Sequence, residues 1–85
     1  MQHLHQRINL DKGDVVNVVL NNQANVMLMD DTNYAVYKRR GSFKYFGGLA
    51  TRSPFRITAP STGYWNLVLD LGGRSGRIEY SVSIL

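Results

Sequence analysis

The basic side chains of this chain gather in two short segments whose chemistry suits an anion. Lys38, Arg39 and Arg40 are consecutive, and Arg74 and Arg77 lie in a second stretch that is rich in glycine. Arginine forks complement phosphate or carboxylate oxygens, and successive backbone N–H groups in glycine-rich turns form concavities that accept anions. Loops also commonly carry solvated arginines that bind nothing. If the chain has a ligand site, these residues are predicted to form it, and an ordinary polar surface is the alternative.

Aromatic residues accompany the first basic segment. Four of them lie close to it in the sequence: Tyr34, Tyr37, Tyr45 and Phe46. Basic residues interleaved with aromatic rings are used to bind single-stranded nucleic acid, through stacking and neutralisation of phosphates. The net charge, however, is only +4, from 10 Lys and Arg against 6 Asp and Glu, and no nucleic-acid-binding signature is present. Nucleic acid is therefore a weaker interpretation that stays open beside a protein or an anionic ligand.

Two neighbouring aromatic residues are predicted to face opposite ways. Trp65 begins an alternation with Leu67 and Leu69, so we expect it to anchor the core. Tyr64 then projects from the other face and is the candidate surface aromatic residue of the ligand site.

Residue types that bind metals are few. His3 and His5 share one face of a predicted strand, with Cα atoms about 6.5–7 Å apart. A metal ion would need a third ligand, and the chain has no other histidine and no cysteine. The oxygen-rich run 30–33 (Asp-Asp-Thr-Asn) does not match a calcium loop, and its side chains are explained as caps of a turn. We predict no metal site and no cofactor.

A catalytic constellation is also missing from the sequence. Ser61 and Thr62 lie in a predicted turn without a histidine nearby. Asp70 and Glu79 could approach each other on adjacent strands, but Asp70 is expected at an outward position or a strand end. A domain of this size also rarely encloses a deep pocket that excludes water. We predict no catalytic residues and no enzyme activity.

The predicted secondary structure is β-strand, because the dominant period of the hydrophobic residues is two and no window shows a sustained helical period. Eight segments are predicted as strands: Gln2–Leu10, Asp14–Leu20, Ala24–Met29, Tyr34–Lys38, Ser42–Phe46, Pro54–Ala59, Tyr64–Leu71 and Arg77–Leu85. The fourth and fifth form a hairpin that ends at Gly47-Gly48. This pattern predicts a single all-β domain over residues 1–85. It is either an antiparallel β-sandwich or a jelly-roll-like barrel of about seven or eight short strands.

The composition is that of a globular domain, with 44% hydrophobic and 19% charged residues. No apolar run approaches the roughly 20 residues that a membrane span needs, and the N-terminus lacks a signal-peptide pattern. We therefore expect a cytoplasmic protein without a membrane partner.

The alternation also predicts the core. Its members are Leu4, Ile8, Leu10, Val16, Val18, Leu20, Val26, Leu28, Phe55, Ile57, Trp65, Leu67, Leu69, Ile78, Tyr80, Val82 and Ile84. Other apolar residues fall on faces that a simple two-layer sandwich would leave in water: Val15, Val19, Met27, Met29 and Val68. Strands that are apolar on both sides are covered by another segment or by a partner. A homodimer and a monomer are therefore equal alternatives.

Several segments together point to a family. They are Gly13-Asp14-Val15-Val16, Ala24-Asn25-Val26, Leu28-Met29-Asp30-Asp31, Asn33-Tyr34, Tyr37-Lys38, Gly47-Gly48, Gly63-Tyr64-Trp65, Asp70-Leu71-Gly72-Gly73 and Gly76. In this order, over nearly the whole chain, they resemble the bacterial domain-of-unknown-function family 1883. The resemblance implies a compact all-β domain, usually a small standalone protein and sometimes one joined to a TIR-type signalling domain. It implies no catalytic residues.

Two classes of function follow. The first is a non-catalytic binding or sensor module whose loops recognise a ligand, with an anion as one candidate. The TIR-type domains that accompany the resembled family favour this class by analogy. The second is a structural or oligomerising accessory domain with no ligand of its own. A loop-lined concavity with converging polar groups would favour the first class.

Overall fold

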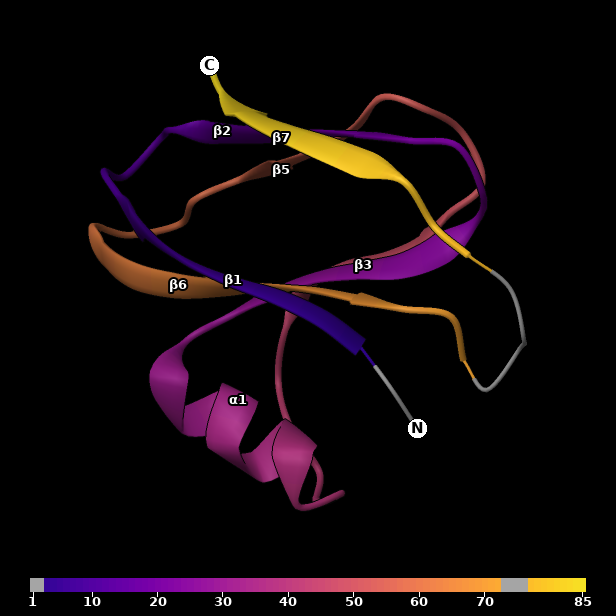
Figure 1. Ribbon diagram of the computed structural model, residues 1–85. Helices are drawn as coiled ribbons and strands as arrows, with labels where there is room; N and C mark the ends of the chain where they lie inside the picture. Colours follow the sequence, from indigo (N-terminus) through magenta and orange to yellow (C-terminus); the bar gives the residue numbers. More distant parts are fainter. Residues whose placement is uncertain (1–2, 73–76) are drawn as a thin grey trace.

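Seven strands and one helix make up the part of the chain that the computed structural model describes, residues 3–72 and 77–85 (Figure 1). In chain order they are β1 (His3–Leu10), β2 (Val15–Leu20), β3 (Ala24–Met29), α1 (Asp31–Lys38), β4 (Phe46–Ala50), β5 (Phe55–Thr58), β6 (Gly63–Asp70) and β7 (Tyr80–Ile84). The segments predicted as strands before residue 30 and after residue 53 each contain one strand. The hairpin predicted between them is wrong.

The strands form two antiparallel sheets that face each other. The larger sheet has four strands in the order β1-β6-β3-β4, and the smaller sheet has three in the order β5-β2-β7. Figure 1 shows the smaller sheet above the larger one, with α1 beneath the larger sheet. The predicted all-β fold is confirmed in its sandwich form, because the two sheets are separate rather than closed into one barrel.

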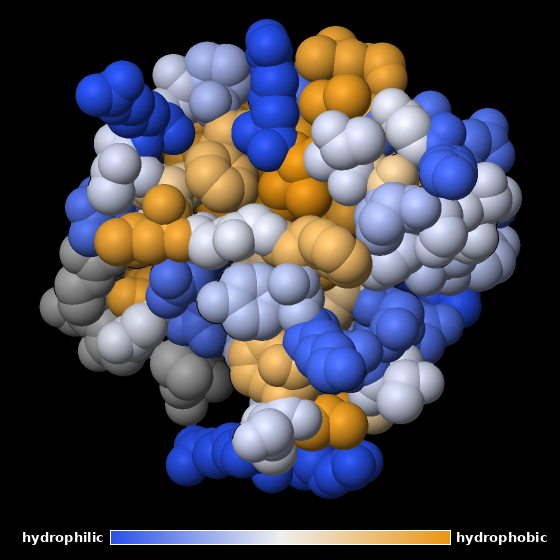
Figure 2. Space-filling view, turned by 180° about the vertical axis from the view of Figure 1, so that it is seen from behind, coloured by the Kyte–Doolittle hydropathy of each residue, from blue (hydrophilic) through white to orange (hydrophobic). Residues whose placement is uncertain are grey.

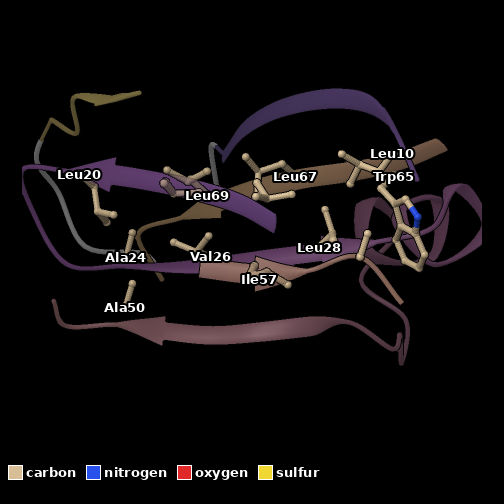
Figure 3. Packing of buried hydrophobic residues seen from close by; sticks show 13 residues of the cluster. Leu10, Leu20, Ala24, Val26, Leu28, Ala50, Ile57, Trp65, Leu67 and Leu69 are labelled. Atoms are coloured by element: carbon tan, nitrogen blue, oxygen red, sulfur yellow. The ribbon is translucent and has the colours of Figure 1, made fainter. Parts of the chain in front are cut away.

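The core lies between the sheets, where the inward-facing residues of both meet (Figure 3). Most of the predicted core residues are buried there: Leu10, Val16, Val18, Leu20, Val26, Leu28, Ile57, Trp65, Leu67 and Leu69. Five others pack against them with partial burial: Ile8, Phe55, Ile78, Tyr80 and Val82. The prediction is wrong for Leu4 and Ile84, which are 37% and 44% exposed. Both lie near the outer end of an edge strand, β1 or β7, where no further strand covers them.

The segment Tyr34–Lys38, predicted as a strand, is the greater part of helix α1. Asp30 caps this helix, because its carboxylate accepts a hydrogen bond from the Asn33 backbone N–H at 2.8 Å. Lys38 places a positive charge in the last turn, where it complements the helix dipole. The run 30–33 thus begins a helix rather than forming a turn. A helix of eight residues is too short for its period to stand out against the neighbouring alternation.

Strand β4 begins at Phe46 and continues through Gly47-Gly48 instead of stopping there. Gly47 has a φ of +113°, and a Cβ atom at this position would lie 2.2 Å from the carbonyl oxygen of Val26 in β3. Only glycine allows this approach of two backbones. The glycine pair therefore belongs to the strand pairing, and Ser42–Phe46 is not a strand.

The outer face of the larger sheet is covered by the chain itself. Met27, Met29 and Val68, which a simple two-layer sandwich would leave in water, are buried there. They pack against aromatic rings of α1 and of the segment that follows it: Tyr34, Tyr37 and Phe43. Of the two alternatives for this apolar outer face, cover by another segment of the chain and cover by a partner, the structure shows the first for these three residues. Val19, on the outer face of the smaller sheet, is 45% exposed, and the homodimer stays a prediction.

Candidate functional site

The predicted basic residues lie in different parts of the molecule. Lys38, Arg39 and Arg40 are exposed at the C-terminal end of α1, beneath the larger sheet. Arg77 precedes β7 of the smaller sheet (Figure 1), and Arg74 lies outside the described residues. Because the larger sheet stands between α1 and β7, the structure does not bring Arg77 together with the end of α1.

Tyr64 projects from the outer face of β6 and is 52% exposed, whereas Trp65 faces the core. Arg7 lies over the Tyr64 ring, 4.0 Å from its centroid, which is an attractive cation–π arrangement. The same guanidinium donates two hydrogen bonds to the Asp31 carboxylate, at 2.7 and 3.1 Å. Tyr64 therefore supports a contact at the start of α1, at the opposite end of the helix from Lys38.

Polar side chains fill the space between α1 and the larger sheet. We call them the α1 network: His3, His5, Asp31, Tyr34, Tyr37, Asn66 and Asp70. Asn66 and Asp70 are only 1% and 4% exposed. Polar groups buried to this extent need hydrogen-bond partners.

Asn66 joins three elements of this network. Its amide nitrogen donates to Oδ1 of Asp31 at 2.8 Å and to the carbonyl oxygen of Met29 at 3.3 Å. Its amide oxygen therefore faces His5, whose Nε2 lies 2.7 Å away. Since an amide oxygen only accepts, Nε2 of His5 carries the proton and donates it. The His5 ring also stacks on Tyr34, with ring centroids 4.1 Å apart.

Asp70 and His3 complete the network. The Asp70 carboxylate accepts hydrogen bonds from the Tyr37 hydroxyl and, at 2.7 Å, from the Gly72 backbone N–H. Nε2 of His3 lies 3.0 Å from the hydroxyl oxygen of Tyr34. No buried side-chain nitrogen or oxygen in the described ranges lacks a partner. Donors and acceptors in the α1 network are thus matched to one another, and together they hold α1 on the sheet.

Two groups of this region have shifted pKa values. Hydrogen bonds from Arg7 and then from Asn66 lower the pKa of Asp31 to about 2. Burial raises the pKa of Tyr37 well above its ordinary value, and the hydrogen bond to Asp70 adds to the rise. Asp31 is therefore held charged and Tyr37 neutral, which are the states that make the observed hydrogen bonds.

A hollow of about 250 Å³ opens at one end of the sandwich, between the β2–β3 turn and the β4–β5 loop. We call it the loop hollow, and its lining consists of Leu20, Asn21, Asn22, Gln23, Ala50, Thr51, Arg52 and Ser53. Strand register produces it: Ala24 pairs with Ala50, so the residues before one and after the other leave the sheet side by side. A hydrogen bond of 3.1 Å from the Leu20 backbone N–H to Oγ of Ser53 ties the two segments together.

Unpartnered side-chain groups in the loop hollow are mainly donors. Oδ1 of Asn21 accepts the Glu79 backbone N–H at 2.8 Å, and Oδ1 of Asn22 accepts the Gln23 N–H at 2.9 Å. Since a backbone N–H can only donate, both amides are fixed with their oxygens toward the backbone and their NH₂ groups away from it. Among the residues that the structure describes, these NH₂ groups and the Arg52 guanidinium have no hydrogen-bond partner.

The charge on the lining of the loop hollow is positive. Arg52 supplies it, and no aspartate or glutamate belongs to the lining. The backbone of Glu79, just before β7, is paired with Asn21 of the lining. Arg52 was not singled out by sequence, since its neighbours come from a segment about thirty residues away and only the strand register joins the two.

Edge strand β4 exposes two large apolar residues that a partner could cover. Phe46 and Leu49 are 49% and 53% exposed. The view from behind in Figure 2 shows the hydrophobic side chains of this face interrupted by hydrophilic ones. The loop hollow, with its polar lining from two loops, is therefore the better candidate site.

Fold and site define a small antiparallel β-sandwich with a helix over one outer face and a polar hollow at one end. The chain belongs to the family described as Domain of unknown function (DUF1883), whose model matches residues 1–85, and the resemblance found in the sequence is thereby confirmed. No curated protein and no solved structure matches the chain. Within residues 3–72 and 77–85, no three His, Asp or Glu side chains are grouped to hold a metal ion. No helix in these ranges has the length and apolar character needed to cross a membrane.

Proposed function

We propose that this domain is a non-catalytic binding module that holds a small ligand in the loop hollow. The observation that carries the proposal is a hollow lined by two loops, whose polar side chains include the amides of Asn21 and Asn22 and the guanidinium of Arg52. Ligand sites are concave and use a few well-placed polar groups to fix the ligand. Because both loops are anchored to paired strands and to each other, the backbone of the site is in place before a ligand arrives.

The residue types of the loop hollow support binding rather than catalysis. Thr51 and Ser53 bring hydroxyl groups, but the lining has no histidine, aspartate or glutamate to take a proton from them. The two histidines of the chain, His3 and His5, are engaged in the α1 network on the outer face of the larger sheet. A hydroxyl group without a base hydrogen-bonds to a ligand but is a poor nucleophile.

An oligomerising role is the second candidate, and the smaller sheet favours it. Val19 and Leu85 are 45% and 62% exposed there, and α1 lies on the far side of the molecule (Figure 1). A second copy of the chain would cover these residues. Light scattering at micromolar protein concentration tests this role, and a strict monomer removes it.

Backbone NMR of ¹⁵N-labelled protein tests the binding function. A panel of sugars, nucleotides, phosphates and carboxylic acids is added one compound at a time. We expect at least one compound to shift the amide resonances of residues 21–23 and 51–53 and to leave those of α1 in place. The same compound should raise the midpoint of thermal unfolding, because a ligand of the folded state stabilises it. Resonances in both loops that no compound moves would overturn the proposal.

A further inference from the structure

We infer that the ligand of the loop hollow is a compact anion that carries a phosphate or carboxylate group. The inference rests on the proposed binding function and adds to it the chemical class of the ligand and the groups that select it. These groups are the Arg52 guanidinium and the side-chain amides of Asn21 and Asn22.

The amide of Asn21 is locked with its donors available. Its oxygen accepts the Glu79 N–H at 2.8 Å, while its own backbone N–H donates to the Glu79 carbonyl oxygen at 3.1 Å. Turning the amide over would set NH₂ against a backbone N–H, two donors face to face, and would lose the hydrogen bond. The NH₂ group is therefore what this side chain can offer to a ligand.

Asn22 repeats this arrangement at the next position. Its oxygen accepts the Gln23 N–H at 2.9 Å, which again leaves the NH₂ group for a partner. Two adjacent amides thus present donors while their acceptors are occupied. A carboxylate or an ionised phosphate consists of acceptors and satisfies such a surface, whereas a neutral polyol brings a donor with every acceptor.

Arg52 supplies the charge that distinguishes an anion from a neutral acceptor. Its side chain is exposed and forms no ion pair within the described part of the chain. A guanidinium group binds carboxylate or phosphate oxygens through two parallel N–H bonds. Since the lining holds no acidic residue, no carboxylate of the hollow itself competes for this cation.

The hollow has room for a small ligand group. Its volume of about 250 Å³ lies below the roughly 300–1,000 Å³ that sites for drug-sized ligands occupy. An anionic group with a few further atoms fits this space.

The test is an NMR titration with paired probes and paired variants. Inorganic phosphate, glycerol 3-phosphate and succinate are the anionic probes, and glycerol and glucose are the neutral ones. Arg52→Gln removes the charge from the hollow, and Arg39→Gln removes the same charge from the end of α1. NMR is preferred to thermal shift alone, because phosphate also stabilises proteins by exclusion from their surface.

We expect the anionic probes to shift the resonances of residues 21–23 and 51–53 in the parent protein. Arg52→Gln should weaken their binding about tenfold or more, because a charge-assisted hydrogen bond to the ligand is lost. Arg39→Gln should bind like the parent. Binding should weaken as NaCl rises from about 0.05 M to about 0.5 M. The ratio of the affinities for phosphate and succinate then tells which anionic group the site prefers.

The contrary outcomes separate this inference from the function on which it rests. If a neutral probe shifts these resonances and no anion does, the binding function stands and the anionic class is overturned. If neither kind of probe shifts them, the binding function fails as well. Equal weakening by Arg39→Gln and Arg52→Gln would indicate a general attraction to a basic chain and would overturn the assignment to the loop hollow.

Discussion

The α1 network and the loop hollow are both polar, and they differ in how far their hydrogen bonds are satisfied by the chain itself. Under α1, each buried side-chain nitrogen and oxygen of the described residues has a partner. At the hollow, backbone N–H groups occupy the oxygens of Asn21 and Asn22, while the NH₂ groups and the Arg52 guanidinium are left over. Polar residues that are matched to one another hold a fold together, whereas the donors of Asn21, Asn22 and Arg52 remain available to groups from outside the chain.

The difference follows from where the two regions lie. The α1 network is closed between a helix and a sheet, beside the buried residues Met27, Met29 and Val68. An unmatched polar group there would cost the full free energy of its desolvation. The loop hollow lies where strands end and loops meet water, so water can serve as the hydrogen-bond partner of its donors.

The largest effect on stability is expected from Asn66→Ala, because Asn66 lies at the centre of the α1 network. The substitution leaves His5, Asp31 and the Met29 carbonyl without their amide partner and opens a cavity under α1. We expect the free energy of unfolding to fall by about 2–4 kcal/mol. Urea denaturation followed by circular dichroism measures this fall, with Asn22→Ala in the hollow as the matched control. A loss no larger than that of the control would show that the network does not stabilise the fold.

Tyr37→Phe removes one hydroxyl from the same network and should cost less. Asp70 keeps the Gly72 N–H but loses its second donor, which we expect to lower the free energy of unfolding by about 1–2 kcal/mol.

The pH dependence of Tyr37→Phe sharpens this prediction. Because the pKa of Tyr37 is raised in the folded state, its contribution is present below the ordinary value of 10 and is lost as the pH rises above it. The parent should therefore lose more stability than Tyr37→Phe between about pH 9 and about pH 11. Parallel profiles in denaturant titrations at these two pH values would contradict the role of the hydroxyl.

A weaker effect on stability is expected from the exposed ion pair between Arg7 and Asp31, at the edge of the α1 network. The pKa of Asp31 is lowered to about 2 from an ordinary value of 3.8. A lowered pKa adds stability above the ordinary value, and this stability is lost as the pH falls from about 4 toward about 2. Both Asp31→Asn and Arg7→Gln should flatten this part of the profile in thermal unfolding. A variant that keeps the slope of the parent would show that the Arg7–Asp31 pair does not contribute to stability in acid.

The sequence predicts the strands of the sandwich well, but it predicts neither helix α1 nor the loop hollow. Alternation locates the strands and the inward face, as at Val16, Val18 and Leu67, because a period of two is a property of each strand alone. Helix α1 was not predicted by this alternation, although Asp30 before it and Arg40-Gly41 after it are start and stop signals of a helix. The aromatic residues Tyr34, Tyr37 and Phe43 are equally typical of a strand. Their packing on Met27 and Met29 is what favours the helix, and this tertiary contact is not visible in the local sequence.

The loop hollow depends on information that no single segment carries. Its two walls meet because β3 and β4 pair with Ala24 opposite Ala50. Alternation fixes the face on which each residue lies, but it does not by itself fix which residue of β4 lies opposite Ala24. The basic residues that attract attention in the sequence, Lys38 to Arg40, lie at the end of α1 instead. Arg52 stands alone in the sequence, and it becomes a candidate only when the turn at residues 21–23 is placed beside it.

The smallest effect on stability is expected where the effect on binding is largest. Arg52→Gln removes an exposed side chain that forms no ion pair within the described part of the chain. We therefore expect its free energy of unfolding to stay within about 0.5 kcal/mol of the parent in the absence of added anions. With an anionic probe present, the parent should gain stability that the variant does not, because only the parent binds the probe through this guanidinium. Urea denaturation with and without succinate measures both quantities. A variant that is destabilised without any anion would show that Arg52 stabilises the fold. The proposed difference between the loop hollow and the α1 network would then not hold for Arg52.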